Sequence, residues 1–251
     1  MTLQLQLIRS ATVRLAIDGF VLLVDPYLAA PGEGRSYAGT VRSPLVPLPV
    51  PAEDLVREAD AVFVSHLHSD HFDDAARALL PATKPLWCPA PVAEGLRAFG
   101  FTNVTGIADT FAHAGFSLQM TPGRHGPDAV LEAMGAVHGF VLRTPGHGPL
   151  YWVGDSIHCP EVTRTIAATQ PACIVVHACG ADWKGLAPLV MDCAMVEAVL
   201  AEAPGAQVIA THLDAVDHAT VSRADLRTWF APKPALAARL RIPADGERIA
   251  L

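Results

Sequence analysis

Residues 65–73 read SHLHSDHFD, and this stretch decides the fold class of the chain. His66 and His68 are two residues apart, so on an extended chain their side chains point the same way and can bind one metal ion. Asp70 and His71 are adjacent and would point to opposite faces of a strand. They converge on a second ion only where the chain turns, and the residues that follow are typical of a helix. The pattern favours a metal site over a loop of solvated histidines.

Segments typical of strands alternate with helical segments in both halves of the chain, which predicts one α/β domain over residues 1–251. Residues 61–65 form a continuous apolar run, as expected of a strand buried on both faces. The other predicted strands cover residues 2–8, 12–17, 21–24, 104–107, 116–120, 140–143, 150–153, 174–176 and 207–210. The predicted helices cover residues 54–58, 73–80, 92–99, 161–168, 191–203 and 222–230. Residues 29–51 are expected to form a long functional loop, and Asp245-Gly246 is expected to form the turn of a terminal hairpin.

Two further candidate ligands follow apolar strands. Asp155 comes directly after Gly154 at the end of one predicted strand, and His212 lies just beyond the end of another. Open α/β sheets place their ligand-binding groups at the carboxyl ends of strands, so both side chains are expected at one edge of the sheet. Because a carboxylate has two oxygens, Asp155 is a candidate bridge between two ions.

The remaining histidine ligand has two candidates, His125 and His147. His147 lies in a Pro-Gly-x-Gly segment between two strands, which is typical of a tight turn. The short strand after it would place His147 at the opposite end of the sheet from Asp155. His125 follows the end of the 116–120 strand and is therefore the favoured ligand, with His147 interpreted as part of a hairpin turn.

Composition disfavours several classes of protein. The formal net charge is −7 and no run of lysine or arginine occurs, so a nucleic-acid partner is not expected. No apolar stretch reaches bilayer length and no signal segment is evident, so we expect a cytoplasmic protein without a membrane partner. The five cysteines contain no C-x-x-C pair, which argues against a disulfide framework or a thiolate zinc site.

The metal-binding motif and its companions resemble the metallo-β-lactamase superfamily. Residues 65–73, residues 123–126, Gly154-Asp155 and His212 occur in the order found in that family. The chain lacks the glycine that glyoxalase-II-like members carry two positions after Phe72, and His71-Phe72-Asp73 instead resembles the branch that contains L-ascorbate-6-phosphate lactonase. The loop at residues 42–45 and residues 123–126 are similar to uncharacterised members of that branch. The resemblance implies a four-layer αβ/βα sandwich of the α/β class, with metal ions at the sheet edge.

The resemblance also implies a ligand set and a cofactor. The first ion would be held by His66, His68 and His125, the second by Asp70, His71 and His212, and Asp155 would bridge the two. Two divalent ions are expected. Zinc is the default for a His and carboxylate set, although manganese and iron(II) accept the same ligands.

This centre implies a hydrolase whose metal-bridging hydroxide cleaves a small-molecule lactone or ester. Asp155 and Asp70 are the candidate catalytic residues, Asp70 because it can return a proton to the leaving group. The alternatives are a phosphodiesterase acting on a small substrate, an iron-dependent oxidoreductase and a binding module without activity. Lys184 or Arg42 would suit an anionic substrate, and the oligomeric state is left open.

Other residues are weaker candidates. Ser65 and Asp73 could orient ligand imidazoles, with a charge at a helix N-terminus as the alternative for Asp73. The residues interpreted as either pocket-lining or ordinary loop residues are Arg42, His158, His177, Asp182, Trp183 and Lys184. The residues interpreted as structural are His113, His138, His218 and Cys159, with support of a ligand as the alternative for His218.

Overall fold

The computed structural model describes residues 2–186 and 188–251, which form two seven-stranded sheets packed face to face. The first sheet has the order β14-β1-β2-β3-β4-β5-β6 and the second β13-β12-β11-β10-β9-β8-β7. The strands of the first sheet are β1 (Leu3–Arg9), β2 (Thr12–Ile17), β3 (Phe20–Val24), β4 (Ala61–Phe63), β5 (Leu86–Pro89), β6 (Val104–Ile107) and β14 (Arg248–Ala250). Those of the second are β7 (Thr110–His113), β8 (Phe116–Pro122), β9 (His138–Arg143), β10 (Leu150–Trp152), β11 (Cys173–His177), β12 (Gln207–Thr211) and β13 (Leu240–Arg241).

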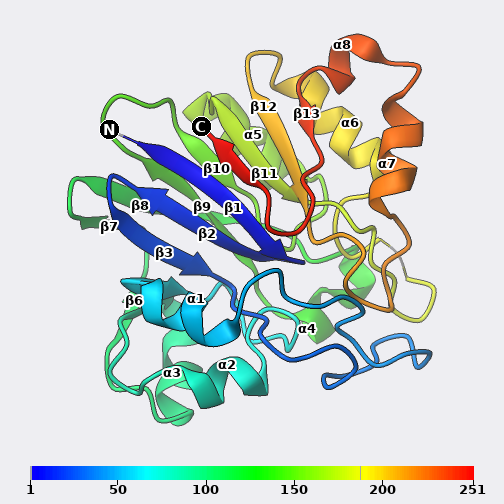
Figure 1. Ribbon diagram of the computed structural model, residues 1–251. Coiled ribbons are helices and arrows are strands. Elements are labelled where there is room, and N and C mark those ends of the chain that lie inside the picture. The colour runs from blue at the N-terminus through cyan, green and yellow to red at the C-terminus, as the bar shows by residue number, and fades with distance from the viewer. Residues whose placement is uncertain (1, 187) are drawn as a thin grey trace.

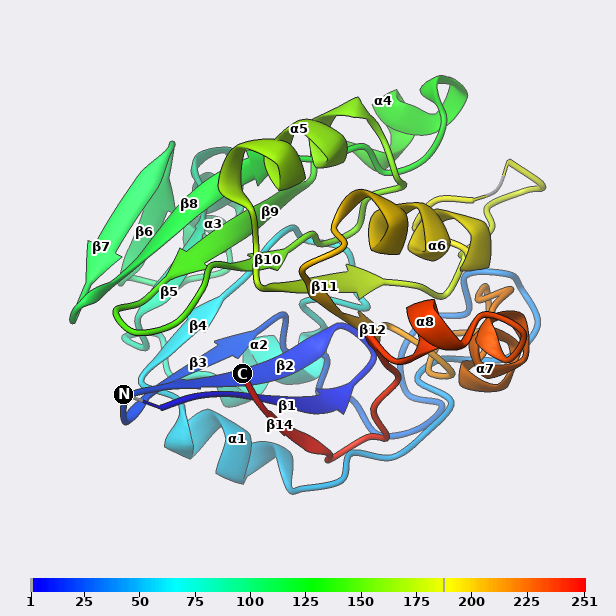
Figure 2. The same cartoon turned by 90° about the horizontal axis from the view of Figure 1, so that it is seen from above.

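Helices cover the outer faces of both sheets, which makes four layers (Figures 1 and 2). The helices near the first sheet are α1 (Ala52–Glu58), α2 (Asp74–Leu79) and α3 (Ala93–Ala98). The other helices are α4 (Leu131–Met134), α5 (Pro160–Thr169), α6 (Cys193–Glu202), α7 (Arg223–Phe230) and α8 (Pro234–Ala237). The expected αβ/βα sandwich is therefore confirmed. Among the helices of the described residues, none has the length and apolar character needed to cross a membrane.

Strand β4 shows why such a short apolar run is buried on both faces. Ala61 and Phe63 point into the core between the two sheets, whereas Val62 and Val64 pack against the helices outside the first sheet. This alternation follows from the two-residue period of a strand. Phe63 meets Phe140 of the opposite sheet edge to face, with ring centroids 4.9 Å apart, so the strand that precedes the metal-binding turn is anchored from both sides.

Parallel pairing gathers the functional loops at one edge of the sandwich. Strands β3, β4 and β5 run parallel to one another, as do β10, β11 and β12. The chain leaves β4 into the 65–73 turn and leaves the other strands at Asp25, Asp155, His177 and His212. Carboxyl ends of parallel strands meet at the same edge, so these residues approach one another without being close in sequence.

Two local expectations differ from the structure. The hairpin predicted at Asp245-Gly246 is wrong, because β13 pairs with β12 in the second sheet whereas β14 pairs with β1 in the first. The turn there instead carries the chain from one sheet to the other. Strands β5 and β7 were not predicted. Strand β5 lies between β4 and β6 in the first sheet, and β7 forms an antiparallel hairpin with β8. Strands β7, β13 and β14 lie at sheet edges, where few neighbours constrain the sequence.

Candidate metal centre

The turn after β4 brings its two histidines to one side, as the spacing predicts. The backbone N–H groups of His71 and Phe72 both donate to the carbonyl of His68, which closes the turn. Asp73 then accepts a hydrogen bond from the backbone of Ala76 and begins α2. The same carboxylate accepts from the backbone N–H groups of residues 28 and 29, so Asp73 caps the helix and ties down a loop.

A first cluster of potential ligands contains His66, His68, His125 and Asp155. The Nε2 atoms of His125 and His66 lie 3.4 and 3.8 Å from Oδ2 of Asp155. Bonds of 2.0–2.1 Å in a tetrahedral zinc site place ligand atoms about 3.4 Å apart, so these separations suit ligands of one ion. His66 Nε2 is also buried without a hydrogen-bond partner among the described residues. A cation at this position would satisfy that nitrogen.

A second cluster contains His71, His177, His212 and the same Asp155. His71 Nε2 lies 3.1 Å from Asp155 Oδ2 and 3.3 Å from His212 Nε2. Asp70 faces this cluster as well, with its Oδ2 atom 3.5 Å from His212 Nε2. The described structure thus brings all seven predicted ligands together, with Asp155 common to both groups.

His177 is placed differently from the expectation of a pocket-lining loop residue. It is the last residue of β11, is fully buried, and lies beneath the centre. Its Nδ1 atom is 2.6 Å from Asp155 Oδ1. Because this distance is shorter than the spacing of two ligands on one zinc ion, we interpret the contact as a hydrogen bond that positions the carboxylate.

Asp25 orients the metal-binding turn and was missed by the sequence analysis. Its Oδ1 atom accepts a hydrogen bond from Ser65 N at 2.7 Å, and Oδ2 lies 2.7 Å from Ser65 Oγ and 2.8 Å from His71 Nδ1. Ser65 Oγ in turn lies 2.9 Å from His66 Nδ1, so Ser65 does orient an imidazole. Asp25 directly follows a predicted strand, just as His212 does, and this position was the signal that could have identified it.

The other imidazoles are oriented in the same way. His212 Nδ1 lies 3.1 Å from Ser10 Oγ, and His125 Nδ1 donates to the Leu189 carbonyl at 3.0 Å. Contacts on Nδ1 turn Nε2 of each ring toward the cluster. The backbone contributes too, because Asp25 and His212 have φ values of +48° and +62°. This left-handed conformation is uncommon for residues other than glycine, and Asp25 and His212 both adopt it at the centre.

The electrostatics of the cluster favour a cation. Burial alone would lower the pKa of His71, but the carboxylates of Asp155 and Asp25 outweigh it and raise that pKa to about 10. Burial would raise the pKa of Asp155, yet His71 and His177 hold it well below its usual range. Asp70 is likewise kept ionised by His212 and His71, despite its burial. Two buried carboxylates therefore remain charged, and protonated imidazoles or a bound cation must supply the positive charge beside them.

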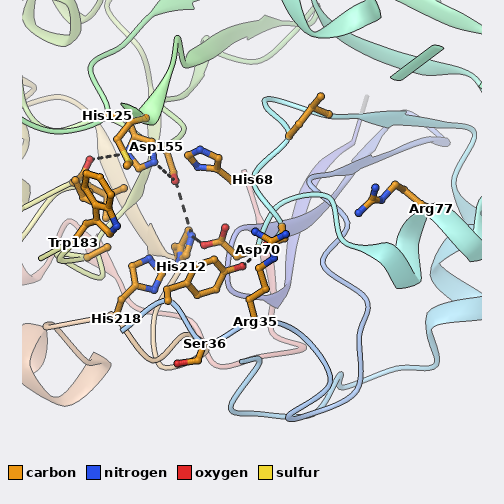
Figure 3. Close-up of a pocket in the computed structure, with 17 residues that line it drawn as sticks. Arg35, Ser36, His68, Asp70, Arg77, His125, Asp155, Trp183, His212 and His218 are labelled. Atoms are coloured by element: carbon orange, nitrogen blue, oxygen red, sulfur yellow. Dashed lines mark hydrogen bonds and ion pairs between the residues drawn. The ribbon is translucent and has the colours of Figure 1, made fainter. Parts of the chain in front are cut away.

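A pocket of about 420 Å³ opens onto the centre (Figure 3). Part of its wall is apolar, with Leu67, Met134 and Trp183. The figure places His68 and His125 on one side of the opening and His218 and Ser36 on the other. The polar part of the lining includes Arg35, Tyr37, Ser69, Asp70 and Arg77.

Of the weaker candidates, Trp183 and His218 line this pocket. Arg42 instead donates to the carbonyls of Glu33 and Gly34, and His158 pairs with Glu202. Asp182 and Lys184 flank a neighbouring depression. The cationic side chains at the described pocket are therefore Arg35 and Arg77, which sequence reasoning did not identify.

Two of the histidines expected to be structural, His113 and His138, lie away from the centre, whereas His218 lines the pocket. His113 belongs to β7 and contacts the rings of Phe20 and Trp87, and His138 begins β9. His147 lies in the turn between β9 and β10, as predicted. Cys159 is buried in the core behind the second sheet, next to the start of α5.

Comparison with known families agrees with this geometry. A family model described as a β-lactamase superfamily domain matches residues 21–213. The chain belongs to the metallo-β-lactamase superfamily. Among curated proteins, it is similar to UPF0173 protein YddR of Bacillus subtilis, with 33% identity and 96% of each chain covered.

Two solved structures resemble the chain over its whole length. One is described as a possible metal-dependent hydrolase from Veillonella parvula, with a TM-score of 0.95, 28% identity and 100% of each chain covered. The other is an isothiocyanate hydrolase from Delia radicum gut bacteria, with a TM-score of 0.94, 28% identity and 99% of each chain covered. The chain is therefore a metal-dependent hydrolase of the metallo-β-lactamase fold. The narrower resemblance to the ascorbate-6-phosphate lactonase branch stays a prediction.

Proposed function

We propose that this metallo-β-lactamase superfamily member binds two divalent cations and uses them to hydrolyse a small molecule at an electrophilic carbon. The observation that carries the proposal is the position of Asp155, whose Oδ2 atom lies 3.1–3.8 Å from the Nε2 atoms of three histidines, His66, His71 and His125. His66 and His125 belong to the first cluster and His71 to the second, so one carboxylate would serve two ions. We also propose that residues 1–251 form a single domain, because both sheets contribute to the site.

The residues would divide their roles as follows. The proposed ligands are His66, His68 and His125 for the first ion, Asp70, His71 and His212 for the second, and Asp155 for both. When bound, the two cations supply Lewis acidity and a water whose pKa is lowered to roughly 7. Zinc is the expected metal for this donor set.

The chain's own carboxylates would handle the protons. Asp70 faces both the pocket and His212, so it is placed to return a proton to the leaving group. His177 holds the other oxygen of Asp155 and would fix the orientation of that carboxylate beside the histidines of both clusters. The apolar walls at Leu67 and Trp183 would exclude bulk water from the reacting bond.

Lactones and esters are the first substrate class we propose, because their carbonyl carbon is open to attack by water. A second candidate is an isothiocyanate, favoured by the full-length similarity to the isothiocyanate hydrolase. Its central carbon is attacked in the same way: R–N=C=S and water give R–NH₂ and COS. The arginines at the pocket, Arg35 and Arg77, would also accept a substrate that carries an anionic group.

The test combines metal analysis with a substrate panel. We expect about two equivalents of zinc per chain and turnover of a γ-lactone, an aryl ester or an aryl isothiocyanate that a chelator abolishes. His68→Ala should lose bound metal and activity while it stays folded, whereas His113→Ala, which removes a histidine far from the centre, should keep both. Turnover that continues after a chelator has removed the metal would contradict the proposal. Bound iron with oxygen uptake would support the oxidoreductase alternative, and hydrolysis of only a diester would support the phosphodiesterase.

A further inference from the structure

One carboxylate, that of Asp217, anchors the long loop before α1 beside the site through hydrogen bonds. This side chain lies in the segment that follows β12 and accepts five hydrogen bonds from a part of the loop distant in sequence. The donors are Ser36 Oγ (2.5 Å), Tyr37 N (2.8 Å), Ala38 N (3.2 Å), Thr40 Oγ1 (3.2 Å) and Ser43 Oγ (3.4 Å). The backbone N–H of Asp217 also donates to Ser43 Oγ at 3.0 Å.

These contacts set the position of Tyr37. Its ring packs on His218, the residue next to the anchor, with centroids 4.7 Å apart. Its hydroxyl lies 2.8 Å from Oγ of Ser69, a residue of the metal-binding turn that directly precedes Asp70 in the sequence. Tyr37, Ser69, Asp70 and His218 all line the pocket, so the phenol forms part of the wall that a substrate would face.

The hydroxyl of Tyr37 is suited to donate a hydrogen bond into the pocket. Ser69 can donate its own proton to the phenol oxygen, which leaves the phenol proton free to rotate toward a bound molecule. Burial and the nearby Asp70 carboxylate raise the pKa of Tyr37 far above its usual value, so the group stays protonated at neutral pH. A neutral donor at this place would stabilise negative charge that develops on a substrate atom.

We propose that Tyr37 contacts the substrate as a hydrogen-bond donor and that Asp217 is the positioning residue that holds it over the metal centre. The inference rests on the proposed function and specifies how its site would recognise the substrate. The substrate carries an oxygen, nitrogen or sulfur acceptor directly attached to the reacting carbon. If the loop were only a structural cover, the hydroxyl would be dispensable.

Two variants separate these roles, each with a matched control. Tyr37→Phe removes the hydroxyl, and its control Tyr27→Phe removes a buried hydroxyl that has no hydrogen-bond partner among the described residues and lies outside the pocket. Asp217→Asn weakens the anchor, and its control Asp225→Asn alters a helix-capping carboxylate at the start of α7. Metal content is measured for all variants, and amide hydrogen exchange is followed over residues 36–43.

We expect Tyr37→Phe to lower kcat at least tenfold, to change KM less than kcat, and to leave zinc content and exchange unchanged. Asp217→Asn should raise exchange at the amides of residues 37 and 38 at least tenfold and lower kcat/KM, with zinc retained. Both controls should match the wild type.

Three outcomes decide between the claims. Unchanged kcat and KM in Tyr37→Phe would overturn the role of the hydroxyl while the proposed function stands. Unchanged exchange in Asp217→Asn would overturn the role of the anchor. A zinc-loaded wild type that turns over no member of the panel would contradict the proposed function and the assignment of Tyr37 with it, and the exchange data would still decide whether Asp217 holds the loop.

Discussion

Replacing Asp25 with asparagine exchanges one buried oxygen for an amide group beneath the metal centre. In the wild type the carboxylate takes part in three hydrogen bonds, one with Ser65 N, one with Ser65 Oγ and one with His71 Nδ1. The amide oxygen can keep the first contact, and the amide N–H can donate to the Ser65 hydroxyl. The third contact is lost, because two N–H donors would then face each other at His71.

This loss acts on the metal through the tautomer of His71. With no acceptor at Nδ1, the neutral ring prefers to carry its proton on Nε2, the atom that faces Asp155 and must be free to bind an ion. Substitutions of such supporting groups lower metal affinity by about 10- to 100-fold. At about 1.4 kcal/mol per decade, the expected cost is roughly 1.4–2.8 kcal/mol of binding free energy. The cost should fall on the second ion, since the ligands of the first keep their contacts.

The assay is competition for zinc against a chromophoric chelator, with the two binding steps resolved. Asp60→Asn is the control, because Asp60 accepts a backbone hydrogen bond from Val21 on the solvent-exposed surface at the other end of the same strands. We expect the dissociation constant of the weaker binding step to rise about 10- to 100-fold in Asp25→Asn and neither dissociation constant to change in the control. Equal affinities in Asp25→Asn and the wild type would refute the argument from the tautomer.

Three further predictions concern protons and packing. His71, whose pKa is raised to about 10 without metal, must lose its proton on binding, so zinc affinity should rise with pH up to about 10; titration calorimetry in buffers of different ionisation enthalpy should detect the released proton. Gly139→Ala should lower the free energy of unfolding by about 1–3 kcal/mol, because a Cβ there would lie 2.4 Å from a backbone oxygen, whereas Gly205→Ala has open space and should be neutral or stabilising in chemical denaturation. Arg9→Leu should cost about 3 kcal/mol of stability by thermal unfolding, since the buried guanidinium donates to three backbone carbonyls within residues 27–46; a melting temperature equal to the wild type's would contradict this.

Local sequence patterns account for most of what could be predicted about the metal centre. The spacing of His66 and His68, the turn they occupy and the strand ends at Asp155 and His212 could be interpreted from the sequence, because strand period and strand termini are local properties. The choice of His125 over His147 followed from the same reasoning, and the structure places only His125 beside Asp155. The four-layer sandwich followed from the family resemblance and not from periodicity.

The tertiary structure decided which side chains reach the site from irregular segments. Arg42 and Lys184 were the expected cations, yet Arg35 and Arg77 line the pocket, and Tyr37 is held there by Asp217 from a segment about 180 residues away. Such a loop has no repeating period, so the direction of each side chain depends on distant hydrogen bonds that no local pattern encodes. The assignment of the last two strands to different sheets has the same cause, because pairing partners are chosen by the folded core and not by the turn between them.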